Sequence, residues 1–162
     1  MSMLRPAGRF VFVGTLVVGA VAALSACGST PSAPGAAACS SNPDHVTVVV
    51  QSSSSHTVQR CVGFSGAGIN ALAALRSSGI EMGTQTYSFG TSICQLDNVP
   101  AHYSTCLPSN APYWALFDAQ PGKTKWASPI VGVSDVTLTN GAALGFRYDP
   151  QTGTAAPPSV AP

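Results

Sequence analysis

Three histidines, a run of serines and five cysteines are the side chains of this chain that could carry chemistry. The serines at 52–55 directly precede His56, which suggests a nucleophile beside its base, but no carboxylate has an evident place to orient the histidine. Residues 63–67, Gly-Phe-Ser-Gly-Ala, depart from the Gly-x-Ser-x-Gly nucleophile motif at the last position. His45 and His102 are scattered elsewhere. We therefore expect no catalytic residues and no enzyme, and a small hydrolase that uses His56 or His102 stays the alternative.

Cys27 ends a segment that is typical of a secretory signal. Two arginines precede an apolar stretch of about 14 residues, which is shorter than the roughly 20 that a membrane span needs. The ending Leu-Ser-Ala-Cys at 24–27 resembles the lipobox of bacterial lipoproteins. That resemblance implies that residues 1–26 are a cleaved signal peptide and that Cys27 carries a lipid. We expect an extracytoplasmic protein anchored to the membrane by this lipid, and which membrane holds it stays open.

The other four cysteines, Cys39, Cys61, Cys94 and Cys106, predict two disulfides in an exported domain. Of the three pairings, we favour Cys39–Cys61 and Cys94–Cys106, because each closes a short loop worth about 3 kcal/mol. A metal site made of Cys94, His102 and Cys106 is the rival interpretation. It lacks a clear fourth ligand, and thiols oxidise outside the cytoplasm. We therefore expect no metal and no cofactor.

The composition argues against nucleic acid as a partner and indicates where the folded domain begins and ends. Charged residues make up only 8% of it and the formal net charge is +1, so no basic patch favours nucleic acid. Residues 27–38 are rich in Ala, Ser, Pro and Gly, which predicts a flexible lipidated tether. Residues 150–162 have a similar composition and are predicted to be a disordered tail. The folded domain is then expected at 39–149.

The hydrophobic pattern of residues 39–149 predicts an α+β domain with a mostly antiparallel sheet, one short helix and two disulfides. The helix is expected at 66–78, where Ile69, Leu72 and Leu75 recur at helical spacing and Gly79 ends the run. Strands are expected at 46–50, 57–64, 87–93, 113–117, 130–138 and 144–148.

Residues 66–71, Gly-Ala-Gly-Ile-Asn-Ala, match the glycine spacing of a dinucleotide-binding motif. Such a motif needs a parallel strand after the helix that ends in an acidic residue, and no such strand follows here. We interpret these glycines as a turn into the helix.

Tyr113, Trp114 and Trp126 are the candidate ligand-binding residues. In a strand, Tyr113 and Trp114 face opposite sides of the sheet, so aromatic surface is expected on both. One side belongs to the core, and the other is either covered by loops or forms a platform for a ligand.

Residues 46–148 resemble the small C-terminal domain of transcobalamin and intrinsic factor, a domain also found in actinobacterial secreted proteins. The matching features, in order, are a hairpin ending in Cys61, the short helix, Phe89 to Asp97 with Pro100 and Cys106, then Tyr113-Trp114, Trp126, and Gly145 to Tyr148. The resemblance implies a small β-grasp-like domain. In transcobalamin this domain caps a corrinoid held against a large helical domain, which is absent here.

These observations favour a surface lipoprotein with a non-enzymatic domain that binds a ligand or a partner protein. Capture of a corrinoid or another nutrient is the narrower form of this hypothesis. The alternatives are a small envelope hydrolase and a purely structural envelope lipoprotein.

Overall fold

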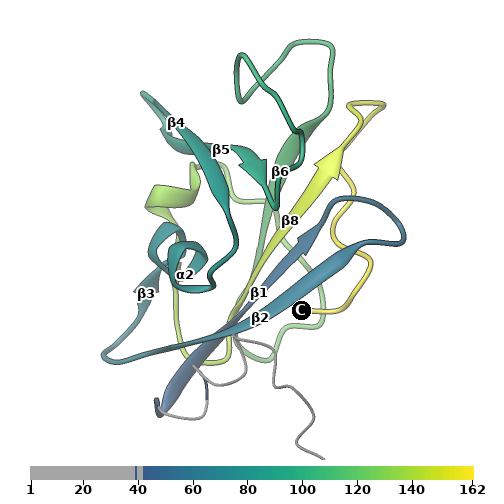
Figure 1. Cartoon of the computed structure of the whole chain (residues 1–162). Coiled ribbons are helices and arrows are strands. Elements are labelled where there is room, and N and C mark those ends of the chain that lie inside the picture. The colour runs from purple at the N-terminus through teal and green to yellow at the C-terminus, as the bar shows by residue number, and fades with distance from the viewer. Residues whose placement is uncertain (1–38, 40–41) are drawn as a thin grey trace, which may run out of the picture.

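The computed structural model describes Cys39 and residues 42–162 of the chain (Figure 1). The predicted signal peptide at 1–26, the lipid-bearing Cys27 and the tether at 27–38 lie outside the described residues. Within the described part, no helix is long and apolar enough to cross a bilayer.

The main sheet has four strands in the order β2-β1-β8-β6. The hairpin of β1 (Asp44–Gln51) and β2 (Thr57–Phe64) is antiparallel, as predicted. β8 (Ala143–Asp149) returns parallel to β1, and β6 (Tyr113–Ala119) pairs antiparallel with β8 at the edge of the sheet. The two central strands read as long apolar runs because their residues are buried on both faces.

The hydrophobic core lies between one face of this sheet and α2 (Ala71–Ser77) (Figure 1). The larger apolar side chains in it are Val46, Val48, Val50, Val62, Phe64, Leu72, Leu75, Leu96, Trp114, Leu138, Leu144 and Phe146. The structure therefore confirms a sheet-rich α+β domain with one α-helix among the described residues.

The helix is shorter than the predicted span of 66–78 because a two-residue strand precedes it. β3 (Ile69–Asn70) pairs with β7 (Thr137–Leu138), and Asn70 caps α2 by accepting from two backbone N–H groups of its first turn. A Cβ at Gly68 would lie 2.9 Å from the Leu138 carbonyl oxygen. The Gly-rich motif thus serves a turn and a close strand approach, and the next strand after α2, β4 (Met82–Tyr87), pairs antiparallel with β5 (Gly90–Leu96).

Two predicted strands are corrected. The expected strand at 87–93 spans a hairpin turn between β4 (Met82–Tyr87) and β5 (Gly90–Leu96), where Gly90 has a φ of +114°. Larger and smaller side chains alternate without interruption through this turn, so the sequence pattern did not indicate that the chain reverses its direction there. The expected strand at 130–138 is a loop, then the 3₁₀ helix η1 (Val133–Asp135) and β7.

Both favoured disulfides are present, and they exclude the metal interpretation. Cys39 pairs with Cys61 on β2, with a Cα–Cα distance of 5.6 Å, and Cys94 on β5 pairs with Cys106, with a Cα–Cα distance of 4.0 Å. Because the Cys94 and Cys106 sulfurs are bonded to each other, they are not available as thiolate ligands.

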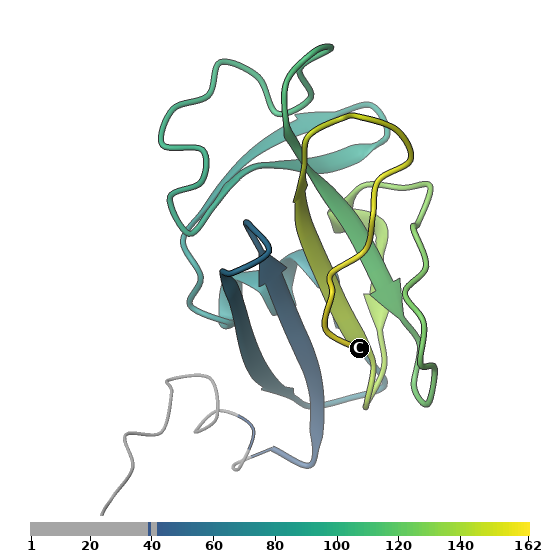
Figure 2. The same cartoon turned by 90° about the vertical axis from the view of Figure 1, so that its right-hand side faces the viewer.

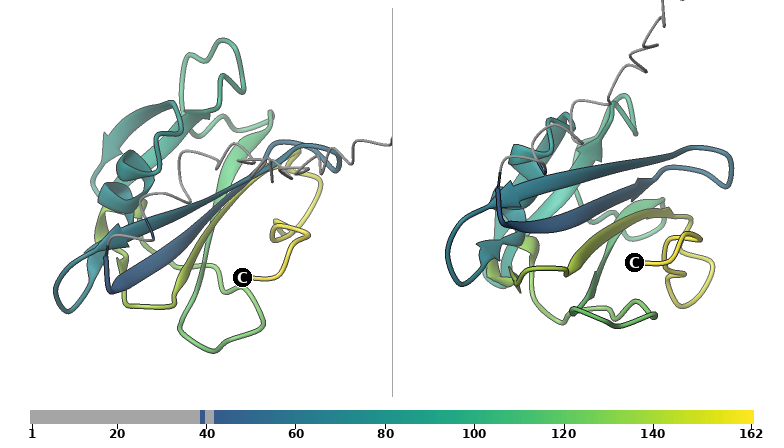
Figure 3. Two further views of the ribbon diagram at one scale, coloured as in Figure 1. Left: turned by 60° about the horizontal axis from the view of Figure 1, so that its bottom comes forward. Right: turned by 90° about the horizontal axis from the view of Figure 1, so that it is seen from below.

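The C-terminal segment, residues 150–162, which the sequence predicts to be disordered, lies across the second face of the sheet. Figure 2 views this face, with the segment in front of β8 and β6, and Figure 3 shows it from below. Gln51 on β1 both donates to and accepts from Ser159, at 2.8 Å each, and Arg147 donates to the Pro157 carbonyl at 2.8 Å. The segment therefore covers backbone and side chains that would otherwise face solvent.

Candidate functional site

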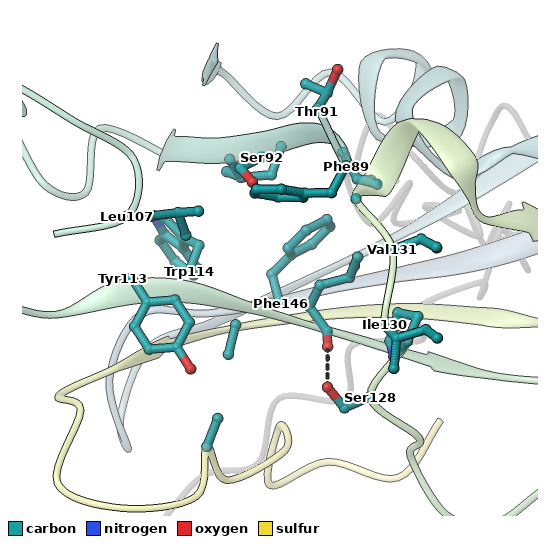
Figure 4. Close-up of a pocket in the computed structure, with 17 residues that line it drawn as sticks. Phe89, Thr91, Ser92, Leu107, Tyr113, Trp114, Ser128, Ile130, Val131 and Phe146 are labelled. Carbon is teal, nitrogen blue, oxygen red and sulfur yellow. Dashed lines mark hydrogen bonds between the residues drawn. The ribbon is translucent and has the colours of Figure 1, made fainter. Parts of the chain in front are cut away.

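A pocket of about 260 Å³ runs along the free edge of β6, between that strand, β5 and the chain at 128–133 (Figure 4). Its walls come from segments that lie far apart in the sequence. Of the five large apolar side chains that are exposed in the described part, four line this pocket: Phe89, Leu107, Ile130 and Val131.

The open edge of β6 presents backbone groups to the pocket. Asp118 exchanges two backbone hydrogen bonds of 2.8 Å with Ala127, so its N–H and C=O point away from β8. Residues two apart in a strand direct these groups to the same side, which places those of Leu116 and Trp114 on this edge too. The Leu116 carbonyl accepts from Ser128 Oγ at 3.4 Å, the dashed bond of Figure 4. The N–H of Leu116 and the N–H and C=O of Trp114 have no hydrogen-bond partner among the described residues.

One wall is fixed by a ring stack and by a disulfide. Phe89, in the β4–β5 turn, stacks on Tyr87 with ring centroids 5.2 Å apart and an interplanar angle of 7°. Leu107 directly follows Cys106, and the Cys106–Cys94 bond ties the loop that carries Leu107 to β5. The disulfide therefore positions a pocket residue as well as stabilising the fold.

The opposite wall is held by a close approach between two backbones. The Gly132 N–H donates to the Phe89 carbonyl at 3.1 Å, and a Cβ at Gly132 would lie 2.8 Å from both the N and the O of Thr91. Ser134 Oγ accepts from the Thr91 N–H at 2.9 Å. These contacts anchor the end of the loop, while Ile130 within it is 99% exposed.

The pocket lining is uncharged. None of its 17 residues is Asp, Glu, Lys, Arg or His, and its side-chain polar groups include the hydroxyls of Thr91, Ser92 and Ser128. Burial, and then the nearby carboxylate of Asp149, raises the pKa of the Tyr113 phenol above its usual value of 10.0. The phenol is therefore neutral at physiological pH, and an uncharged ligand fits this lining best.

Two of the three predicted aromatic residues line the pocket. Tyr113 is half-buried and lies at the start of β6. Trp114 is buried in the core, and its indole N–H donates to the Val99 carbonyl at 2.7 Å. Tyr113 is thus available to a ligand, whereas the ring of Trp114 is mainly a core side chain.

The structure does not bring Trp126 to this pocket. Its indole N–H donates to the Val160 carbonyl at 2.9 Å, and its ring lies against Gly145, where a Cβ would come within 2.8 Å of the ring. Trp126 therefore helps to hold the C-terminal segment on the second face of the sheet.

Sequence reasoning missed the four exposed apolar residues of the pocket. Phe89 was assigned to the interior of a strand, and Ile130 and Val131 to the start of another. The available signal was weak: large apolar side chains next to glycine and proline, in segments whose length and flanks suit loops. Their convergence depends on how the loops pack.

The structure gives His56 an acidic neighbour that its own stretch of sequence lacks. His56 Nε2 lies 3.1 Å from Asp97 Oδ2, and both side chains are about half exposed. A serine nucleophile would have to contact the other ring nitrogen, and within the described residues His56 has no hydrogen bond to a serine hydroxyl. His45 lies on β1 and His102 in the loop between β5 and β6. Among the described residues the three histidines do not form a group that could hold a metal ion.

Comparison with known proteins gives a distant structural similarity and no family. No protein-family model matches the sequence, and no curated protein matches it significantly. The crystal structure of a "putative metal binding protein" from Ruminococcus gnavus is similar, with a TM-score of 0.47 and 12% identity over 66% of this chain and 97% of that chain. At this level the likeness says nothing of what this chain binds. In the described part of the chain, no group of three or more His, Cys, Asp or Glu side chains could hold a metal ion.

Proposed function

We propose that this protein is a non-enzymatic binding module of an extracytoplasmic lipoprotein, and that the pocket at the edge of β6 is its ligand site. The observation that carries the proposal is the convergence of Phe89, Leu107, Ile130 and Val131 on this pocket. Monomeric proteins rarely gather exposed apolar side chains unless a partner covers them. The two disulfides support an oxidising compartment, in agreement with the lipobox-like ending at Cys27.

We also propose a β-grasp-like fold for the domain. A hairpin, a crossing helix and a last strand that lies parallel beside the first strand support this assignment. Fold similarity leaves the ligand open. The pocket is smaller than the roughly 300–1,000 Å³ of sites that enclose drug-sized ligands. A corrinoid would therefore touch it with one face, and corrinoid capture would need a second protein.

The proposal is tested by titrating the full-length protein with N-phenyl-1-naphthylamine, an uncharged apolar fluorophore, and in parallel with cobinamide. We expect saturable one-to-one binding of the fluorophore, weakened at least fivefold by Ile130→Ser and by Phe89→Ser. Tyr103→Ser is the matched control, because Tyr103 is 44% exposed but lies outside the pocket. Equal affinity in all four proteins would refute the pocket as a ligand site and favour a purely structural role.

The second candidate function, a small envelope hydrolase, rests on the His56–Asp97 pair. It is tested by labelling the full-length protein with a fluorophosphonate that reacts with activated serines. Labelling that is lost in His56→Ala and Asp97→Asn, but kept in His102→Ala, would establish the hydrolase. No labelling of a folded protein would remove it.

A further inference from the structure

The pocket exposes backbone groups of β6 that are unpaired in the described part of the chain, and an apolar ligand would form no hydrogen bonds with them. The N–H and C=O of Trp114 and the N–H of Leu116 lie on the free edge of β6 without a partner among the described residues. Backbone groups that are shielded from water without a hydrogen-bond partner destabilise the state that buries them. An apolar ligand seated against this edge would shield these groups and leave them unbonded.

We propose that the natural occupant of the pocket is an extended, uncharged peptide segment that adds to β6 as a further strand. This inference rests on the proposed function, because it names the ligand of the same site. Successive residues of a strand rise about 3.3 Å and direct their backbone groups alternately to either side. A peptide strand therefore supplies donors and acceptors at the spacing that Leu116 and Trp114 present.

An isolated antiparallel bridge shows that this edge accepts an extended chain. Ala127 already occupies the equivalent place opposite Asp118, with two bonds of 2.8 Å. An added peptide would continue beyond Ala127 along β6, opposite Leu116 and then Trp114. Only a short stretch is needed, because the open part of the edge is bounded by Ser128 at one end and by the start of β6 at Tyr113.

The residues that line the pocket determine which side chains of the peptide can enter it. In a strand, alternate side chains point to opposite faces, so every second residue would face Phe89 and the apolar interior of the pocket. No acidic or basic side chain lines the pocket to compensate a buried charge. The segment is therefore apolar at alternate positions and uncharged at those that enter the pocket.

A second copy of this chain is a poorer occupant than a single strand. The open edge lies between Phe89 and Leu107 on one side and Ile130 on the other (Figure 4). The same walls stand beside β6 in a second copy, so pairing of the two edges would bring the walls of both copies together. A lone extended segment has no such walls.

The test begins with a displayed library of random octapeptides selected against the full-length protein. We expect peptides with alternating apolar residues that slow hydrogen exchange at the amides of Trp114 and Leu116. A scan of single N-methyl groups along a selected peptide should then weaken binding about tenfold at the one position whose N–H donates to the Trp114 carbonyl, and little at the residues on either side of it. Equal sensitivity at all positions, or no protection of these two amides, would overturn the proposal.

Protein variants give a second measurement. Leu116→Pro removes the outward N–H without touching the bonds to β8, and an edge strand tolerates proline there. Leu116→Ala removes the side chain but keeps the N–H, and is the matched control. We expect Leu116→Pro to bind the peptide about tenfold more weakly than Leu116→Ala. Equal affinity of the two folded variants would refute the role of this N–H.

The outcomes separate the two proposals. If no peptide is selected but N-phenyl-1-naphthylamine binds and depends on Ile130, the pocket is a ligand site and the peptide inference fails. If neither probe binds, both fail. Concentration-dependent dimerisation that Leu116→Pro abolishes would replace the peptide by a second copy.

Discussion

The two halves of the outer edge of β6 differ although they belong to one strand. At Asp118 the edge is paired by Ala127, whereas at Leu116 and Trp114 it faces the pocket. In an antiparallel ladder the residue opposite Leu116 would be Pro129, two positions beyond Ala127. Proline has no N–H to donate, so the ladder ends there and the Ser128 hydroxyl takes the Leu116 carbonyl instead.

The outer edge of β6 is therefore paired along one half and open to another chain along the other half. Exposed strand edges attract other chains, and proteins usually cover or interrupt them. Here the chain covers half of the edge, turns away after Pro129 and is anchored by the hydrogen bond from Gly132 to the Phe89 carbonyl in the β4–β5 turn. The gap between the two anchored points is the pocket.

The largest effect is expected from removing the disulfide beside the open half. Replacing Cys94 and Cys106 by serine should lower the free energy of unfolding by about 3 kcal/mol. It should also abolish fluorophore binding to the folded variant, because Leu107 loses its anchor. Denaturant unfolding and the fluorescence titration measure the two effects.

The matched control removes the other disulfide. Cys61→Ser with Cys39→Ser should cost a similar amount of stability, yet it should leave binding within twofold, because Cys61 lies on β2 at the far edge of the sheet. Loss of binding in both variants would mean that stability alone, and not the position of Leu107, controls the pocket.

The next effect comes from the anchor at Gly132. Gly132→Ala places a Cβ 2.8 Å from backbone atoms of Thr91, which cannot give way as a flexible side chain would. We expect a loss of about 1–3 kcal/mol in stability and weaker binding, since the loop must shift away from Phe89. Gly153→Ala, where the new Cβ meets no atom within 4 Å, is the control and should be close to neutral. Unchanged binding in Gly132→Ala would contradict the role of this anchor.

A smaller change sharpens the contrast between the two halves. Pro129→Ala restores an N–H opposite Leu116, so the chain can extend its pairing with β6 into the open half. We expect an added hydrogen bond of about 1 kcal/mol and several-fold weaker binding of a selected peptide, measured by titration. Hydrogen exchange of the new amide reports whether it is bonded. Tighter peptide binding in this variant would mean that Pro129 does not hold the edge open.

The smallest effect is a pH dependence of stability. Because the pKa of Tyr113 is raised above 10.0 in the folded protein, the native state holds its proton longer than the unfolded chain does. This contribution is complete below pH 10 and is lost as the pH rises through the folded pKa. Unfolding measured between pH 9 and pH 11 should show a fall in stability that is shallower in Tyr113→Phe. An identical fall in both proteins would assign it to other groups, such as Tyr148, whose pKa burial also raises.

Much of the secondary structure and both disulfides could be predicted from the sequence, because local pattern and loop length determine them. The hairpin of β1 and β2, the helix end at Gly79 and the pairing of Cys94 with Cys106 are of this kind. The hairpin at Phe89 could not be recognised, because the alternation of side chains runs through its turn.

Most of the candidate site could not be predicted from local sequence patterns. Tyr113 was identified from its aromatic neighbourhood, but Trp126 lies on the second face of the sheet, with the C-terminal segment. Segment 150–162 has the composition of a disordered tail, yet Gln51, which is 108 residues away from Ser159, holds it by two hydrogen bonds. The composition of a segment indicates whether that segment tends to be disordered by itself. It does not indicate whether another part of the chain offers a surface that binds the segment.

The sequence by itself determined the elements whose causes are local: β-branched strands, a helix ended by glycine, and cysteines close enough to join. The tertiary structure alone decided that β8 lies parallel beside β1, that the C-terminal segment covers the second face, and that Phe89, Leu107 and Ile130 surround the open edge of β6. The physical reason is that these arrangements arise from contacts between residues that are distant in the chain. They depend on which surfaces remain to be buried once the local elements have formed.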